Sequence, residues 1–190
     1  MRLRFRTRRQ RLFSLALILV ILAVSAYQSG WLNSIGKKAE LSQPGLYSVH
    51  QFIDGDTISV DMNGSVETVR FIGVDTPETH KPNTPVQCYG PEAAAHTQAL
   101  IGTSRVRLQA DPLDTNRDRY GRLLRYIYLP DGTLIDQKII QDGYGFAYTQ
   151  FPFDKTEQFK ADEQAAKAAR LGLWAACSVT IEKSGVEQTQ

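Results

Sequence analysis

TISVDMNGSVETVRFIGVD, residues 57–75, is the stretch of the chain that decides its fold. β-Branched and other β-forming residues fill both halves of it and predict one strand at 57–62 and another at 66–74. Asn63-Gly64 lies between these two runs, and this dipeptide is typical of a two-residue hairpin turn. The sequence therefore predicts an antiparallel pair of strands with a tight connection.

The register of this hairpin can be counted outward from its turn, because each strand residue faces a partner on the other strand. The count places Thr57 opposite Val69 or Arg70. Residues 56 and 75 are therefore expected near the same end of the sheet.

The rest of the chain adds short strands and helices around this hairpin. Strands are predicted at residues 46–53, 57–62, 66–74, 105–110 and 123–129. Helices are predicted at residues 91–101, 134–141 and 154–170, and Trp174 is expected to pack back on the core. Three strands in a meander, then a helix and two more strands, indicate an α+β fold that is mainly β barrel. We expect a five-stranded Greek-key barrel of the OB-fold type with three helices.

The N-terminus has the pattern of a targeting segment. Six arginines in the first eleven residues precede an apolar run at residues 12–27. Val24-Ser25-Ala26 fits the small-x-small site of a signal peptidase, so residues 1–26 are predicted to be a signal peptide. The alternative is an uncleaved signal anchor that crosses the membrane with residues 12–32. In either case the rest of the chain is exported, as a periplasmic, extracellular or membrane-anchored domain.

Composition divides the exported part into three regions. A polar linker is predicted at residues 27–45, one folded domain at 46–177 and a disordered tail at 178–190. The whole chain has 22 basic and 20 acidic residues and a net charge of +2. Without the six leader arginines, 16 basic residues face 20 acidic ones, a balance of −4. The overall charge of +2 is therefore no evidence for a basic protein that coats nucleic acid, and any affinity for phosphate must come from local clusters.

The chain has two cysteines, Cys88 and Cys177. An even number in an exported protein favours a disulfide, and the alternative is two free, buried thiols. Together with the three histidines, at positions 50, 80 and 96, these cysteines match no zinc site of known spacing.

Carboxylates gather at the two strand ends that the register brings together. Asp54 and Asp56 lie in the turn before residue 57, and Asp75 and Glu78 follow the strand that is expected to end at residue 74. Carboxylate and main-chain oxygens are hard ligands suited to Ca²⁺ or Mg²⁺. The alternative is that these acids only stabilise turns, which is common for aspartates in loops.

Arginines are the candidates for a matching positive charge. Arg70 lies among apolar residues of its predicted strand, where a guanidinium is costly to bury without an anionic partner. Arg117, Arg119 and Arg122 cluster farther along the chain, and guanidinium groups bind phosphate through two hydrogen bonds at once. The alternatives are a structural salt bridge for Arg70 and a solvated loop for the other three.

Taken together, these motifs resemble one family, the staphylococcal nucleases or thermonucleases. The resemblance rests on five motifs in order: Ile53-Asp54-Gly55-Asp56-Thr57, RFIGVDTPE at 70–78, Tyr89-Gly90-Pro91-Glu92-Ala93, Asp118-Arg119-Tyr120-Gly121-Arg122 and Gly172-Leu173-Trp174. It runs from about residue 47 to residue 175, the whole predicted domain. The order and spacing of five separate motifs make it specific.

The resemblance implies an OB barrel with one bound Ca²⁺, and endonuclease and exonuclease activity on DNA and RNA with 3′-phosphate products. Asp56 and Asp75 would be direct Ca²⁺ ligands, together with the main-chain carbonyl of Thr76. Asp54 would lie behind these ligands.

The resemblance also implies roles for the charged and aromatic residues. Glu78 would hold the attacking water and take its proton, while Arg70 and Arg122 would bind the phosphate and stabilise the transition state. The expected substrate-binding residues are Arg119, beside the phosphate, and Tyr120 and Tyr148, at the terminal phosphate and base.

The residues alone leave two other functions open. A binding module of the same fold would dock protein or nucleic acid without cleaving it, although such modules typically lack the carboxylates and arginines present here. A phosphodiesterase that uses Mg²⁺ or Mn²⁺ would need the same oxygen ligands, which do not decide the metal. The expected partners are DNA and RNA, and the chain is expected to be a monomer.

Overall fold

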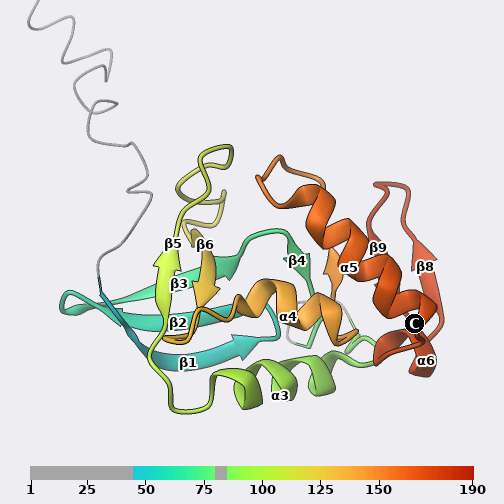
Figure 1. Ribbon diagram of the computed structural model, residues 1–190, viewed down its shortest axis with the longest axis horizontal. Coiled ribbons are helices and arrows are strands. Elements are labelled where there is room, and N and C mark those ends of the chain that lie inside the picture. The colour runs from blue at the N-terminus through green and yellow to red at the C-terminus, as the bar shows by residue number, and fades with distance from the viewer. Residues whose placement is uncertain (1–44, 80–84) are drawn as a thin grey trace, which may run out of the picture. The chain divides into compact units, whose positions relative to one another are not determined.

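The computed structural model describes residues 45–79 and 85–190 (Figure 1). The predicted signal peptide or anchor at 1–26, and the predicted linker at 27–45 except its last residue, lie outside the described residues. Among the residues that are described, no helix combines the length and apolar character that crossing a membrane requires.

Five strands form a mixed sheet in the order β1-β2-β3-β6-β5 (Figure 1). They are β1 (Ser48–Asp54), β2 (Thr57–Met62), β3 (Ser65–Phe71), β5 (Arg107–Gln109) and β6 (Leu123–Tyr128). β1, β2 and β3 form the predicted antiparallel meander, β6 pairs in parallel with β3, and β5 is antiparallel to β6. Tyr47, directly before β1, and Val106, directly before β5, exchange two backbone hydrogen bonds of 2.8 Å, which join the two edge strands of the sheet. The sheet therefore closes on itself, and the fold is an α+β structure on an OB-type barrel.

The central hairpin has the predicted register. Thr57 lies opposite Arg70 in the β2–β3 pair. Asn63 and Gly64 both have positive φ, 51° and 87°, as a two-residue turn of this kind requires. The carbonyl of Asp56 accepts a hydrogen bond of 2.9 Å from the N–H of Phe71. The residue before β2 therefore lies beside the end of β3.

The third strand is shorter than predicted. β3 ends at Phe71, and after a turn a separate strand, β4 (Val74–Asp75), pairs with β7 (Phe146–Ala147). Gly73 in this turn has φ +73°, and a side chain there would meet a phenylalanine ring at 2.6 Å. The prediction of one strand over 66–74 was wrong because β-forming residues lie on both sides of the turn, so the strand pattern continues across it. The turn returns the chain to within hydrogen-bonding reach of Arg70.

The three predicted helices are present, and the described residues add a short one. The helices are α3 (Gly90–Ile101), α4 (Ile135–Gln141), α5 (Thr156–Ala168) and α6 (Leu173–Ala176). α4 contacts α3, α5 and β6, so it connects the helices to the barrel. Trp174, on α6, lies edge-on to Phe146 with ring centres 5.3 Å apart.

The C-terminal residues form a hairpin where the sequence predicted disorder. β8 (Val179–Ile181) and β9 (Glu187–Thr189) pair antiparallel. Just before β8, Cys177 forms a disulfide with Cys88, and the Thr189 hydroxyl donates a hydrogen bond of 2.6 Å to the Cys88 carbonyl. The prediction of a disordered tail at 178–190 was wrong because these contacts tie a polar segment to one that is 89 residues away in sequence.

An aspartate is buried inside the core. Asp136, in the first turn of α4, accepts hydrogen bonds from the backbone N–H groups of Ile72 at 3.0 Å and Ile127 at 2.8 Å. These bonds join α4 to the turn after β3 and to β6. Burial raises the pKa of Asp136 to about 8, although the two N–H donors and the charge of Arg70 act in the opposite direction.

We expect this buried carboxyl to make the fold less stable as pH rises toward 8. An aspartate ionises near pH ~4 in the unfolded chain but near 8 here, so between these values the folded state holds an extra proton. The free energy of unfolding should therefore fall by up to ~1.4 kcal/mol per pH unit in that window. Urea unfolding at several pH values should show the slope in the parent and in Glu157→Gln, whose side chain is 87% exposed. Asp136→Asn should have a shallower slope, and the part that remains below pH 7 comes from Glu163, whose pKa burial raises to about 7. An unchanged slope in that variant would assign it to other groups.

Candidate active site

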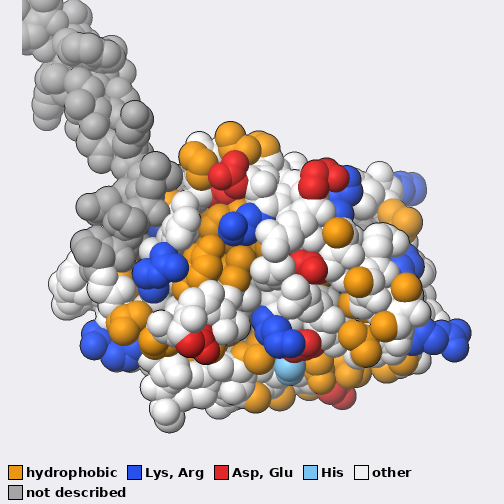
Figure 2. All heavy atoms as spheres, in the orientation of Figure 1, with side chains coloured by type: hydrophobic (Ala, Val, Ile, Leu, Met, Phe, Trp, Pro, Cys, Tyr) orange, Lys and Arg blue, Asp and Glu red, His pale blue; other side chains and the backbone are white. Residues whose placement is uncertain are grey.

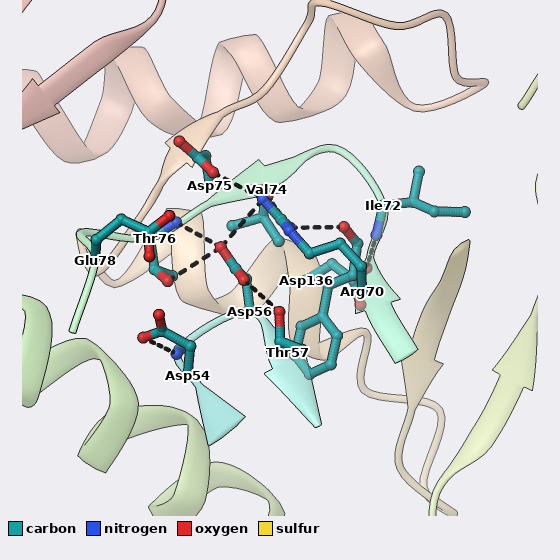
Figure 3. A network of polar contacts seen from close by, with 12 residues as sticks. Asp54, Asp56, Thr57, Arg70, Ile72, Val74, Asp75, Thr76, Glu78 and Asp136 are labelled. Atoms are coloured by element: carbon teal, nitrogen blue, oxygen red, sulfur yellow. Dashed lines mark hydrogen bonds and ion pairs between the residues drawn. The ribbon is translucent and has the colours of Figure 1, made fainter. Parts of the chain in front are cut away.

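Two aspartates from different elements converge on one arginine (Figure 3). Nη2 of Arg70, near the end of β3, lies 2.7 Å from Oδ1 of Asp75 and 3.1 Å from Oδ2 of Asp56. Nη1 donates hydrogen bonds to the carbonyl oxygens of Phe71 at 2.9 Å and Val74 at 2.6 Å. The guanidinium is therefore held in one orientation by four acceptors.

The positive charge of Arg70 is buried and balanced. Its side chain is 12% exposed. Burial alone would lower the pKa of Arg70, but the carboxylates of Asp56 and Asp75 raise it above its ordinary value. The salt bridge considered as an alternative for Arg70 is thus present, and it joins the predicted catalytic arginine to two predicted metal ligands.

Asp56 is held by donors on both of its carboxylate oxygens. Oδ1 accepts the hydroxyl of Thr57 at 2.9 Å, and Oδ2 accepts the N–H of Thr76 at 2.9 Å and its hydroxyl at 3.1 Å. Thr76 can come this close because Gly55 has no side chain, since a Cβ there would meet the Thr76 hydroxyl at 2.7 Å. The glycine between Asp54 and Asp56 therefore allows the two strand ends to touch.

Asp54 lies beside Asp56 and binds the loop that follows β4. Its Oδ1 accepts the N–H of Gly55 at 2.9 Å and the hydroxyl of Thr79 at 3.0 Å. Burial, and after it the negative charge of Asp56, raise the pKa of Asp54. Carboxylates that repel one another in this way favour a cation nearby.

The residues present fit a divalent cation held by few carboxylates. Within residues 45–79 and 85–190, no three His, Cys, Asp or Glu side chains are grouped so that they could hold a metal ion. Asp56 and Asp75 nevertheless direct oxygens at the same Arg70 nitrogen, and the main chain of Thr76 adjoins both aspartates. A hard cation there would bind two carboxylates and complete its shell with main-chain oxygens and water, as Ca²⁺ does.

Glu78 belongs to the same charged region (Figure 3). It is half-buried. Its negative charge also raises the pKa of Arg70, although burial, the two aspartates and Tyr148 have larger effects. Its main chain is bonded to Gln87: the Glu78 N–H donates to Oε1 of Gln87 at 2.8 Å, and the Gln87 N–H donates to the Glu78 carbonyl at 2.9 Å. The structure therefore places all three predicted acidic residues around Arg70.

The second arginine cluster lies on a loop that is organised by an aspartate. Oδ2 of Asp118 accepts Nε–H of Arg122 at 2.7 Å, and Oδ1 accepts the backbone N–H groups of Tyr120 at 2.9 Å and Arg122 at 3.0 Å. Arg119 donates to the hydroxyl of Tyr120 at 2.7 Å. Contacts between described residues thus place Arg122 with Asp118 and Tyr120 and not with Arg70.

Tyr148 follows directly after β7, and both Arg70 and Arg119 act on its hydroxyl. Its N–H donates a hydrogen bond of 2.9 Å to the carbonyl of Gly73. Burial, and then the charge of Asp75, raise the pKa of Tyr148, while Arg70 and Arg119 act in the opposite direction. Tyr148 is therefore within electrostatic reach of Arg119, a second predicted substrate-binding residue, and of Asp75, a predicted metal ligand.

Two residues that organise this site were not predicted to do so. Asp118 orients Arg122, and its place in a tight turn could have indicated this, because turn aspartates bind backbone N–H groups a few residues ahead. Gln87 bonds to Glu78 across nine residues, and no local pattern marks such a pair.

The sheet closes into an OB barrel, and carboxylates converge on a buried arginine at one end of it. This combination indicates a barrel of the nuclease type. The sequence profile of the family described as "Staphylococcal nuclease homologue" matches residues 68–176 of this chain. The chain belongs to the staphylococcal nuclease family.

Named relatives agree with this assignment. The thermonuclease of Staphylococcus hyicus is 37% identical over 163 residues, which are 83% of this chain and 95% of that protein. In Bacillus subtilis (strain 168), the SPbeta prophage-derived endonuclease YokF and the endonuclease YncB are each 44% identical over 124 residues, 64% of this chain. The matched part spans only 41% of the length of YokF and 58% of that of YncB.

Proposed function

We propose that the chain is a calcium-dependent nuclease that hydrolyses phosphodiester bonds of DNA and RNA, within strands and at their ends, to 3′-phosphate products. The observation that carries the proposal is the convergence of Asp56 and Asp75 on the buried Arg70. Glu78 is close enough for its charge to raise the pKa of Arg70 as well. The names thermonuclease and endonuclease of the relatives support the same class of reaction.

Hydrolysis of a phosphodiester needs a positioned water, a base for its proton and positive charge on the phosphate. Bound Ca²⁺, held by Asp56, Asp75 and the Thr76 carbonyl, would supply part of that positive charge. Glu78 holds the water and takes its proton as the water oxygen bonds to phosphorus. The bond from phosphorus to the 5′ oxygen breaks, the 5′ oxygen takes a proton from solvent, and the phosphate remains on the 3′ oxygen.

The arginines bind the substrate. Arg70 and Arg122 donate to the non-bridging phosphate oxygens and stabilise the additional charge of the transition state, while Arg119, Tyr120 and Tyr148 contact the terminal phosphate and the base. Figure 2 shows basic side chains in separate groups, with acidic side chains among them, on the face in view. Affinity for phosphate would therefore come from these few residues, and it should weaken as salt increases.

Digestion of plasmid DNA and of RNA by the full chain tests the proposal. Cleavage with Ca²⁺, none with chelator, and 3′-phosphate ends on the products are the expected results. Cleavage only with Mg²⁺ would indicate a different metallo-phosphodiesterase. Binding of nucleic acid without cleavage under any of these conditions would indicate a binding module.

We also propose that the domain acts outside the cytoplasm, either free or anchored through residues 12–32. The disulfide between Cys88 and Cys177 supports this location, because disulfides persist in oxidising compartments. The mass of the mature chain distinguishes a cleaved signal from an intact anchor. Recovery of the chain in the cytoplasm with two free thiols would reject both.

Loss of the negative charge of Asp118 should weaken catalysis more than folding. Asp118→Asn keeps an acceptor for the loop N–H groups but replaces the charged partner of Arg122. We expect kcat/KM to fall by about 10-fold, because a guanidinium that is no longer oriented binds the phosphate less well. Steady-state cleavage of a short oligonucleotide measures the effect, with Asp114→Asn, in the same loop, as the matched control. An equal loss in both variants would show that Asp118 has no specific role.

A further inference from the structure

Gln87 connects the main chain of Glu78 to the C-terminal hairpin. Its Oε1 accepts the Glu78 N–H at 2.8 Å, and its own N–H donates to the Glu78 carbonyl at 2.9 Å. Its Nε2 donates to Oε1 of Gln188, on β9, at 2.7 Å. One residue thus binds both main-chain polar groups of Glu78 and at the same time a strand from the far end of the chain.

The neighbours of Gln87 hold it in place. Cys88 is bonded to Cys177, and the Cys88 carbonyl accepts the hydroxyl of Thr189 at 2.6 Å. Gly90, the first residue of α3, packs directly on Glu78, because an added Cβ would lie 2.8 Å from the Glu78 carbonyl oxygen. The main chain of Glu78 is therefore enclosed by α3 on one side and by the disulfide-bonded segment on another.

The hairpin is itself fixed to α5. Nζ of Lys167, on α5, lies 3.7 Å from Oε1 of Glu187, on β9. Burial raises the pKa of Glu163, also on α5, to about 7, and the nearby charge of Glu187 adds to this effect. Thr189, at the end of β9, is 2% exposed. The β8–β9 hairpin thus contacts both α5 and Gln87, and Gln87 in turn binds the main chain of Glu78.

We propose that Gln87 is a positioning residue for Glu78, and that the β8–β9 hairpin keeps Gln87 in place through Gln188. This proposal rests on the proposed function, in which Glu78 takes the proton of the attacking water. A carboxylate acts as a base only within hydrogen-bonding reach of that water. A small shift of the Glu78 main chain therefore slows the chemical step more than it changes binding, because Asp56 and the phosphate-binding arginines belong to other segments. Asp75 and Thr76, just before Glu78, are held by their own contacts with Arg70 and Asp56.

Two pairs of variants separate this role from a merely structural one. Gln87→Ala removes both side-chain bonds, and we expect kcat to fall about 10-fold or more, with KM and the Ca²⁺ requirement within about 2-fold of the parent. Gln188→Ala removes the link from Gln87 to the hairpin, together with the bond from Gln188 to Glu182, and kcat should fall about 3-fold. Gln188→Glu, made together with Glu182→Gln so that residue 182 donates to the new carboxylate, keeps an acceptor for the Gln87 nitrogen and should restore most of that loss. Gln164→Ala, at an exposed position of α5, should change nothing.

Steady-state cleavage of a short oligonucleotide by the full-length variants gives kcat and KM, and thermal unfolding shows which variants are folded. A loss confined to kcat and restored in the double variant with Gln188→Glu supports the proposal. An unchanged kcat, a loss that appears in KM instead, or a failure of that double variant to restore kcat would overturn it. If Gln87→Ala does not fold, the two Gln188 variants decide the result.

Hydrogen exchange at the Glu78 amide separates failure of this proposal from failure of the proposed function. That N–H should exchange at least ~10-fold faster in Gln87→Ala than in the parent, whether or not the chain cleaves nucleic acid. Faster exchange in a chain that lacks nuclease activity would support the contact and reject only the function. Unchanged exchange in a folded variant would overturn the positioning role.

Discussion

Replacing Arg70 with alanine should lower the rate of phosphodiester cleavage by at least ~100-fold, the scale of losing one charged contact in the transition state. It should also lower the free energy of unfolding by about 3 kcal/mol or more, because it removes the cation that Asp56 and Asp75 share. The side chain is 12% exposed, so water compensates little of this loss. Added Ca²⁺ should recover part of the stability, because it would supply a new partner for the two carboxylates.

Arg70→Lys distinguishes the charge from the geometry. Lysine keeps the positive charge but not the fork that reaches two carboxylates and two carbonyl oxygens at once. We expect stability between those of the parent and of Arg70→Ala, with activity still strongly reduced. Cleavage kinetics and urea unfolding measure both effects, and Arg105→Ala, at an exposed position, is the control. Near-normal activity in Arg70→Ala would show that its catalytic role is wrong.

The part of the fold that depends on neighbouring residues was predictable from the sequence. The Asn63-Gly64 turn and the strand runs on either side of it determine which residues of β2 and β3 face each other, and Thr57 indeed pairs with Arg70. That register also places Asp56 beside the end of β3, close to Arg70. Asp75, in contrast, reaches Arg70 through the turn at Gly73, which counting along the chain did not predict.

Contacts between distant segments could not be predicted by counting residues in this way. In the strand-like run at 66–74, Gly73 alone hints at a turn, and nothing in the run shows that β4 pairs with β7. The polar composition at 178–190 suggested disorder, yet the disulfide of Cys177 and the hydrogen bonds of β9 hold a hairpin there. Both features depend on partners that are far away in the sequence.

The residues of the candidate site also differ in whether local sequence or distant contacts bring them together. Asp56 and Arg70 lie on or beside one hairpin, so spacing alone grouped them. Asp75 lies on β4 and joins them through the turn that the sequence did not reveal. Arg122 and Tyr148 come from later segments. The arginine cluster marked Arg122 as a phosphate-binding candidate, but only the family resemblance indicated that it acts with Arg70, and only the resemblance indicated Tyr148. The Asp118 contact that orients Arg122, like the Gln87 contact that fixes Glu78, becomes visible only when the chain is folded.

Replacing Glu78 with glutamine should remove most of the activity and little of the stability. Glutamine has nearly the same shape, and the main-chain bonds of residue 78 to Gln87 do not involve its side chain. The amide, however, cannot take a proton from water, so we expect kcat to fall by at least ~100-fold while KM stays close to that of the parent. This pattern differs from that of Arg70→Ala, in which the free energy of unfolding falls as well.

The pH dependence of the residual activity identifies the base. Ionisation of the base produces the acid limb of the kcat profile, so this limb should be present in the parent and absent from Glu78→Gln. Glu92→Gln, which changes an exposed glutamate in the first turn of α3, is the matched control and should keep both kcat and the limb. If Glu78→Gln keeps the acid limb and a kcat within about 10-fold of the parent, a different group takes the proton, because a glutamine cannot titrate in that range. Glu78 would then act only through its charge beside Arg70, and Gln87 would have no catalytic base to position.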